Sequence, residues 1–337
     1  MSRRVRGSPL ARAFERAAKA MTRRVVRSGA RAAGAAAART VKAIADPYRL
    51  PSTAGDWIAG QAAGPAGLRR FRLFRPPGVR STERLPLLVM LHGCGQSASM
   101  FARSTRMDRV ATKERFLVMF PEQDLAANPQ GCWNWYDTRN RRADAEAATL
   151  MAAIDQACLL YPVDRDAVAV AGLSAGAGMA ALLATSYPQR FVAVAMQGGV
   201  APGGAHSAAG TLAAMRGRSL PPTAVPRAER PPLLVIHGSD DHVVSPLNAH
   251  AAAAQWAAAL GASPGAARRV QRGVRHAQTL TDFRAGRCLC VRLCIVDGLG
   301  HAWSGGSAGE RFSDPKGPDA SAMVWRFVKA RLGAVRQ

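Results

Sequence analysis

Short apolar runs alternate with helical patterns from about residue 67 to the C-terminal end of the chain. Runs of this kind, bounded by Gly, Pro or a polar residue, are typical of strands that are buried on both faces. The predicted strands are 68–74, 85–91, 116–120, 167–173, 191–196, 233–236 and 288–296. The predicted helices are 143–160, 175–186, 246–260 and 319–332. This order predicts an α/β fold, with a mostly parallel sheet and helices on both of its faces.

Two segments stand out within this pattern. Segment 68–74 alternates basic and apolar residues, so we predict that it is an edge strand. Segment 198–232 is rich in Gly, Pro and Ala and is too long for an ordinary connection between a strand and a helix. We expect it to form loops or a partial lid over one end of the sheet.

The N-terminal part of the chain differs in composition from the rest. Residues 1–50 hold 13 Lys or Arg side chains against two acidic ones, Glu15 and Asp46, a net charge of +11 out of +24 for all 337 residues. Ala and Arg favour helix, and Leu10, Phe14 and Met21 recur at helical spacing. We therefore divide the chain into a basic segment, 1–66, which is poorly ordered or partly helical, and a folded domain, 67–337.

The basic segment has two interpretations, a solvated tail or a segment that binds an anionic granule or membrane surface. It contains no apolar stretch of the roughly 7–15 residues that a secretory signal or a twin-arginine signal built on Arg23 and Arg24 requires. The whole chain has no uncharged apolar run of about 18 residues, which excludes a predicted transmembrane helix. Nucleic acid is disfavoured as a partner because no aromatic residues are interleaved with the basic ones.

The sequence Gly172-Leu173-Ser174-Ala175-Gly176 fits the pattern G-x-S-x-G. It follows a predicted buried strand and precedes a predicted helix. In that context the chain turns sharply and exposes the serine side chain, while the small flanking residues let strand and helix approach. We predict that Ser174 is a nucleophile.

A serine nucleophile needs a base, and the base needs an acid that orients it. In folds of this kind the acid and then the histidine follow the serine along the chain. His301 stands in a glycine-flanked loop after strand 288–296 and is the predicted base. Asp240 and Asp241, after strand 233–236, compete as the acid; we favour Asp241 and expect Asp240 to stabilise the turn.

The negative oxygen that forms during acyl transfer needs fixed N–H donors. One donor is expected from the backbone of Ala175, which follows the nucleophile. The other is expected from Cys94, in the loop His92-Gly93-Cys94-Gly95-Gln96 after strand 85–91. Only the backbone of Cys94 is needed for this role.

Four stretches together resemble the poly(3-hydroxybutyrate) depolymerase family of esterases, which belongs to the α/β-hydrolases. They are His92-Gly93-Cys94-Gly95-Gln96, Gly131-Cys132-Trp133-Asn134-Trp135-Tyr136, Gly172-Leu173-Ser174-Ala175-Gly176 and Gly300-His301-Ala302-Trp303-Ser304-Gly305-Gly306. The resemblance covers about residues 67–332. It implies an α/β-hydrolase fold and a catalytic triad of Ser174, Asp241 and His301.

The resemblance also implies a substrate. The leading hypothesis is a serine ester hydrolase that cleaves poly(3-hydroxybutyrate) or its oligomers through an acyl-enzyme; the alternative is an esterase of the feruloyl or acetylxylan type. Trp133, Trp135 and Trp303 would line an apolar substrate cleft, or else pack beneath the sheet. A third hypothesis, from a different functional class, is that the protein is not an enzyme and binds a granule or membrane surface through the basic segment.

The six cysteines show no zinc-binding spacing, and no dinucleotide or phosphate motif is present, so we expect no cofactor and no metal. Cys94 and Cys132 both lie in stretches that carry the resemblance, and a bridge between them would indicate an oxidising compartment. Secreted polymer-degrading members of the family usually carry a signal peptide, a linker and a polymer-binding domain. None is recognised in this sequence, which favours a cytoplasmic, granule-associated enzyme over an extracellular or periplasmic one.

Overall fold

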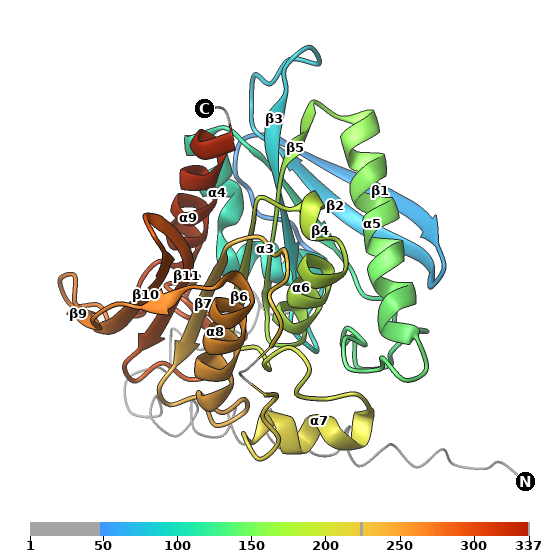
Figure 1. The fold of residues 1–337 in the computed structure, drawn as a ribbon. Coiled ribbons are helices and arrows are strands. Elements are labelled where there is room, and N and C mark those ends of the chain that lie inside the picture. The colour runs from blue at the N-terminus through green and yellow to red at the C-terminus, as the bar shows by residue number, and fades with distance from the viewer. Residues whose placement is uncertain (1–47, 223–224, 336–337) are drawn as a thin grey trace, which may run out of the picture. The chain divides into compact units, whose positions relative to one another are not determined.

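A computed structural model describes residues 48–222 and 225–335 of the chain (Figure 1). The chain divides into two units, Met1–Asp46 and Pro47–Gln337. The first unit, with the predicted amphipathic helix, lies outside the described residues. The boundary predicted at residue 66 is wrong, because strand β1 (Asp56–Gly64) already belongs to the sheet of the second unit.

The described residues form an 11-stranded sheet around which the second unit is built. Six neighbouring strands run parallel to one another at its centre, in the order β4, β3, β5, β6, β7 and β11. Antiparallel strands extend both sides of this parallel group. The bounds after β1 are β2 Gly67–Arg75, β3 Leu85–Leu91, β4 Leu117–Pro121, β5 Val163–Leu173, β6 Ala193–Gln197, β7 Leu233–Gly238, β8 Ser263–Pro264, β9 Arg268–Val270, β10 Gln278–Ala285 and β11 Cys288–Val296. The short pair β12 (Trp303–Ser304) and β13 (Ser313–Asp314) forms a separate small sheet.

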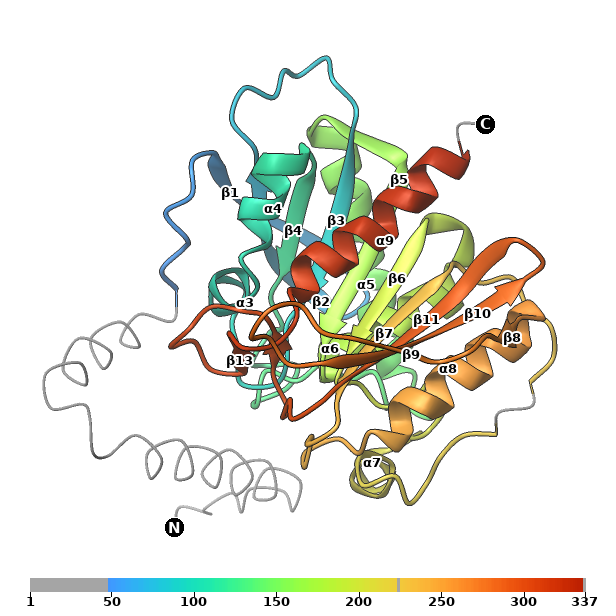
Figure 2. The same cartoon turned by 90° about the vertical axis from the view of Figure 1, so that its left-hand side faces the viewer.

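Helices cover both faces of the large sheet, as predicted (Figures 1 and 2). One face carries α5 (Arg142–Leu160), α6 (Ala175–Ser186) and α8 (Leu247–Leu260). The other carries α3 (Ala98–Thr105), α4 (Met107–Glu114) and α9 (Ala320–Val335). The predicted α/β fold with a mostly parallel sheet is therefore confirmed.

Two predictions about single segments need correction or refinement. Strand β2 is not at the edge of the sheet, because β1 pairs with it along its whole length. Strand β1 is rich in small residues, so no pattern of large apolar residues marks it in the sequence. The ring of Phe71 packs on Gly60, where an added Cβ would lie 2.2 Å from that ring. Segment 198–232 contains one short helix, α7 (Ala208–Met215), which Figure 1 shows at the lower end of the molecule.

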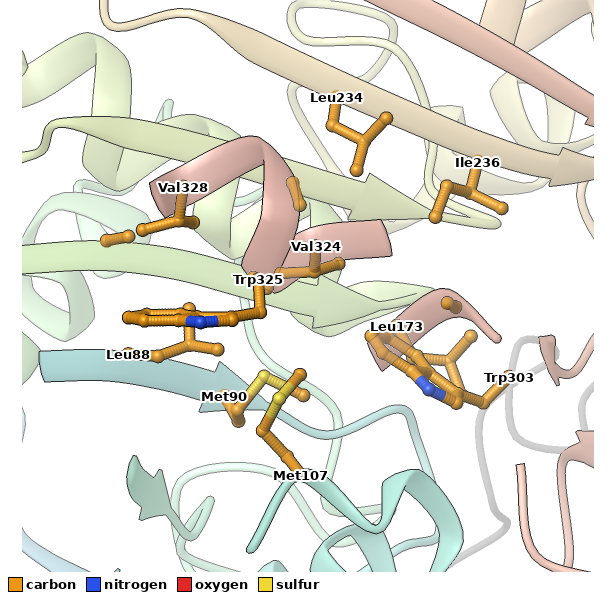
Figure 3. Packing of buried hydrophobic residues seen from close by; sticks show 14 of the residues in the cluster. Leu88, Met90, Met107, Leu173, Leu234, Ile236, Trp303, Val324, Trp325 and Val328 are labelled. Atoms are coloured by element: carbon orange, nitrogen blue, oxygen red, sulfur yellow. The ribbon is translucent and has the colours of Figure 1, made fainter. Parts of the chain in front are cut away.

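The core between α9 and the sheet is built from large apolar side chains (Figure 3). Trp325 of α9 stacks on Phe116 with the ring centroids 3.5 Å apart. Val324 and Val328 are buried beside it, in the same cluster as Leu88 of β3. This packing fixes the C-terminal helix on the strands whose far ends carry the site described below. No helix within residues 48–222 and 225–335 has the length and apolar composition that crossing a membrane requires.

The corrected boundary can be tested with two deletions. Removing residues 1–46 should leave the free energy of unfolding within about 0.5 kcal/mol of the full chain, since the compact unit starts at Pro47. Removing residues 1–66 also deletes β1 and the ring of Trp57, whose centroid lies 5.0 Å from that of Phe74. We expect that deletion to cost at least about 3 kcal/mol in chemical denaturation. Equal stability of the two deletions would contradict the placement of β1.

Candidate active site

Ser174 occupies the sharp turn between β5 and α6. Its backbone has φ 56° and ψ −118°, a combination that costs a non-glycine residue about 1–3 kcal/mol. The turn is held by hydrogen bonds on both sides: the Ser174 N–H donates to the Gln197 carbonyl at 2.8 Å, and the Ser174 carbonyl accepts from the Ala177 N–H at 3.0 Å. The strain is thus maintained by β6 on one side and by the first turn of α6 on the other.

The two glycines of the G-x-S-x-G sequence are required by steric contact. A Cβ on Gly172 would lie 2.2 Å from the carbonyl oxygen of Gly176, so strand and helix could not approach as they do. A Cβ on Gly176 would lie 2.1 Å from the carbonyl oxygen of Leu91 at the end of β3. The serine turn therefore packs backbone to backbone on the start of the loop at 92–96.

Asp241 and His301 form a buried pair. The His301 Nδ1 lies 2.7 Å from the Asp241 Oδ2, and the other oxygen, Oδ1, accepts from the Val243 and Val244 N–H groups at 2.9 and 2.8 Å. Asp240 is exposed and its Oδ1 accepts from the Ser239 hydroxyl. The structure thus brings His301 to Asp241 and leaves Asp240 in the turn.

The turn at Gly198 and Gly199 brings this pair close to the serine. A Cβ on Gly198 would lie 3.3 Å from the His301 Nδ1 and 3.5 Å from the Asp241 Oδ2. A Cβ on Gly199 would lie 3.5 Å from the carbonyl oxygen of Ser174. Ser174, Asp241 and His301 therefore gather around one glycine turn, although they are up to 127 positions apart in the chain.

The surroundings of Asp241 keep it ionised. Burial alone would raise the pKa of this carboxyl group, but the neighbouring His301 and His237 outweigh burial and lower the pKa well below its usual range. His237 is fully buried, and its Nε2 lies 3.3 Å from the Asp241 Oδ2 and 2.9 Å from the Val244 carbonyl oxygen. Asp241 is thus held by two histidines and two backbone N–H groups.

Two residues of this site were not identified from the sequence. Gln197 is buried at the end of β6; its carbonyl accepts from the Ser174 N–H and its side-chain amide donates to the Ala302 carbonyl at 2.6 Å. It therefore links the serine turn to the loop that carries His301. No sequence signal marks Gln197, whereas His237 stands four residues before Asp241 and could have been considered with it.

The loop at 92–96 lies against the serine turn and is cross-linked. Cys94 forms a disulfide with Cys132, and the Gly95 N–H donates to the Gln130 carbonyl at 3.0 Å. A Cβ on Gly93 would lie 3.6 Å from the Ser174 Cβ. Among the hydrogen bonds of the described residues, the backbone N–H groups of Cys94 and Ala175 donate none. They are the two groups predicted to bind the negative oxygen.

Two of the three tryptophans predicted to line an apolar cleft are buried in the core instead. Trp133 and Trp303 are 0% and 1% exposed, so a substrate cannot reach either ring without rearrangement. Their indole N–H groups donate to the His92 carbonyl at 2.9 Å and to the Ser321 hydroxyl at 3.0 Å, and Figure 3 shows Trp303 within the apolar core. Both rings anchor loops instead. Trp135 keeps 8% of its surface exposed, and its ring lies against Gly178 of α6.

Beneath these loops lies a network of buried polar side chains. Glu146 of α5 accepts from the Gln123 amide at 2.7 Å and from the Asn134 N–H at 2.9 Å. Gln123 also accepts from the fully buried Arg69 through its side-chain oxygen, and its N–H donates to the His92 Nε2 at 3.1 Å. The network joins the loop of Cys94 to the loop of Trp133. No group of three His, Cys, Asp or Glu side chains suited to a metal occurs in the part of the chain that the structure describes.

Comparison with known proteins gives the family. A family profile described as "Esterase PHB depolymerase" matches residues 69–277, more than half of the chain. The chain belongs to this esterase PHB depolymerase family. The matched range contains Ser174 and Asp241, and His301 lies beyond it.

Curated relatives of this esterase-family chain include proteins with different named substrates. It is 28% identical over 206 residues to poly(3-hydroxyalkanoate) depolymerase C of Paucimonas lemoignei, which covers 57% of this chain and 48% of the relative. It is 29% identical over 193 residues to feruloyl esterase B of Neurospora crassa, covering 52% of this chain and 65% of the relative. The chain thus spans about half to two thirds of the length of these relatives.

Solved structures support the α/β-hydrolase fold. The acetyl xylan esterase from Aspergillus awamori aligns with a TM-score of 0.58 at 19% identity, over 73% of this chain and 94% of that one. An esterase from Pyrobaculum calidifontis aligns with a TM-score of 0.53 at 17% identity, over 87% of this chain and 90% of that one. At these identities the likeness concerns the fold of the esterase-family chain alone.

The buried His92 gives a testable pH dependence. Burial lowers the pKa of His92 from 6.5 to about 4, so below pH 6.5 the unfolded chain takes up a proton that the folded protein does not. The free energy of unfolding should therefore fall as the pH drops from 6.5 towards 4, with a His92 contribution of about 3 kcal/mol. His92→Gln, whose side-chain oxygen can still accept from the Gln123 N–H, should remove this contribution.

The measurement is chemical denaturation of both proteins at pH 7 and pH 4.5. The variant should lose less stability than the wild type between the two values. Equal losses would show that His92 takes up its proton in the folded protein as readily as in the unfolded chain.

Proposed function

We propose that this protein is a serine ester hydrolase that cleaves poly(3-hydroxybutyrate) or its oligomers, with Ser174, Asp241 and His301 as its triad. The observation that carries the proposal is the 2.7 Å contact between the His301 Nδ1 and the Asp241 Oδ2, next to a serine held at φ 56°. An oriented imidazole close to a serine on a strained turn between a strand and a helix is the arrangement that acyl transfer by serine requires. Membership of the esterase PHB depolymerase family supports the same reaction.

In the proposed mechanism, the Ser174 Oγ attacks the ester carbonyl while the His301 Nε2 takes up its proton. Asp241 accepts from the His301 Nδ1–H and stabilises the imidazolium that forms. The N–H groups of Cys94 and Ala175 bind the negative oxygen of the tetrahedral intermediate. His301 then protonates the leaving alkoxide, which gives the acyl-enzyme. Water, activated by His301, releases the acid and restores Ser174.

The substrate is proposed from the relatives. Poly(3-hydroxyalkanoate) depolymerase C supports a polyester or its oligomers, and feruloyl esterase B supports a feruloyl ester as the second candidate. The burial of Trp133 and Trp303 removes two of the three aromatic rings expected to line the cleft. Trp135 is left as the proposed aromatic contact. The net charge of +11 in residues 1–50 supports attachment to an anionic membrane surface.

The disulfide between Cys94 and Cys132 supports an oxidising compartment, so we propose the extracellular or periplasmic location rather than the cytoplasmic one. The bond closes the chain across 38 residues and ties the proposed oxyanion loop to the loop of Trp133. By loop entropy it should contribute about 4 kcal/mol to stability.

Activity should be lost with single substitutions at the triad. Ser174→Ala, His301→Ala and Asp241→Asn should each lower kcat by on the order of 10³-fold or more. Asp240→Asn and His242→Ala are matched controls, since both residues are exposed neighbours of Asp241, and they should retain activity. The assays compare amorphous poly(3-hydroxybutyrate), its soluble oligomers and a feruloyl ester. Hydrolysis of the feruloyl ester alone would replace the polyester proposal, and full activity of Ser174→Ala would refute the serine mechanism.

The disulfide proposal predicts the number of free thiols. Titration of the denatured protein without reductant should find the four thiols of Cys158, Cys288, Cys290 and Cys294, and reduction should raise the number to six. Reduction should also lower both stability and ester hydrolysis, because it frees the loop of Cys94. Six thiols before reduction, in protein purified from its native compartment without reductant, would contradict the bond and the location.

A further inference from the structure

A groove of about 800 Å³ lies on the α9 face of the sheet, and none of Ser174, Asp241 or His301 lines it. Its lining comes from α4, α9, the strands β7, β9, β10 and β11 and the loops beside them. Figure 2 shows α9 crossing in front of the central strands, with β10 and β11 beside it. The groove is therefore a feature separate from the esterase site, with a volume within the usual range for small-molecule sites.

Apolar side chains form part of the lining of the groove, together with Gln278 and Arg292. Val270, Leu280 and Leu289 contribute from the strands. Met323 and Phe327 contribute from α9. Such a lining gains free energy when an aliphatic group displaces water from it.

The rim of the groove is strongly basic. Arg109 and Lys113 of α4, Arg272 after β9 and Arg326 of α9 line it with exposed side chains, and none of the four forms an ion pair within residues 48–222 and 225–335. The Nε of Arg331 is buried there without a hydrogen-bond partner among the described residues. The groove therefore offers four exposed cationic side chains that form no ion pair with a carboxylate of the described residues.

The acidic groups nearby are already engaged. Glu114 accepts from the Lys329 ammonium at 2.7 Å, and the Asp319 carboxylate accepts from the Ala322 N–H at the start of α9. Asp282, on the neighbouring strand β10, is held by Arg292 through contacts of 2.6 and 2.7 Å. A ligand that carries its own negative charge would thus meet unpaired cations.

We propose that this groove binds a long-chain fatty acid, with its alkyl chain on the apolar lining and its carboxylate on the rim. A guanidinium fork suits a carboxylate, which it can bind through two parallel hydrogen bonds. A polyanion without an aliphatic part would leave the apolar lining in contact with water. A second copy of this chain would bring like charges together at the rim, which disfavours it as the occupant.

The first test is calorimetric titration of the full chain with myristate, kept below the concentration at which it forms micelles. The proposal expects one saturable site. Acetate, which has the charge but no chain, and 1-tetradecanol, which has the chain but no charge, should bind at least tenfold more weakly. Absence of saturable myristate binding, or equal binding of 1-tetradecanol, would overturn the proposal.

The second test places the site. Arg272→Glu combined with Arg326→Glu should weaken myristate binding at least tenfold and leave the thermal midpoint and ester hydrolysis unchanged. Arg70→Glu is the matched control, since Arg70 is an exposed arginine of β2 at the opposite side of the sheet, and it should bind like the wild type. Equal affinity of the double variant and the control would locate the binding elsewhere. Saturable binding of a short DNA duplex that the double variant loses, without myristate binding, would identify a polyanion site and also overturn the proposal.

Discussion

The close approach of β5 and α6 is the constraint on which the rest of the site depends. Gly172 and Gly176 meet backbone to backbone, at a distance that leaves no room for a Cβ on either residue. This contact forces the chain through the strained turn at Ser174, and Gly176 also packs on the carbonyl of Leu91. One steric contact therefore sets the position of the serine, of the first N–H of α6 and of the loop that follows β3.

Hydrogen bonds of buried polar side chains connect the other parts of the site to this contact. Gln197 joins the serine turn to the His301 loop, with one hydrogen bond from its backbone and one from its side chain. Glu146 and Gln123 join the two loops that the Cys94–Cys132 disulfide also ties. Buried polar groups cost free energy unless they are satisfied. The Glu146 and Gln123 side chains are satisfied by one another and by loop backbone, whereas the Gln197 Oε1 is buried without a hydrogen-bond partner among the described residues. The arrangement gives the loops a fixed geometry without placing them on strands.

Much of the site could be predicted from the sequence because its chemistry lies in short local patterns. The turn at Ser174 follows from two glycines around a serine between a strand and a helix, and strand β11 and helix α6 have the predicted ends. Strand β1 was missed because small residues give it no apolar pattern, although they make room for Phe71. The role of Gln197 depends on its contact with Ala302, 105 residues further along the chain. The role of the tryptophans depends on their burial. A local sequence pattern records neither property.

Trapping of the acyl-enzyme tests directly whether Ser174 carries the acyl group. The full chain is mixed with a soluble 3-hydroxybutyrate oligomer, quenched in acid during turnover, digested and analysed by mass spectrometry. We expect a hydroxybutyryl adduct on the peptide that contains Ser174, and no adduct in Ser174→Ala. An adduct on another residue, or an adduct of equal amount in the variant, would contradict this expectation.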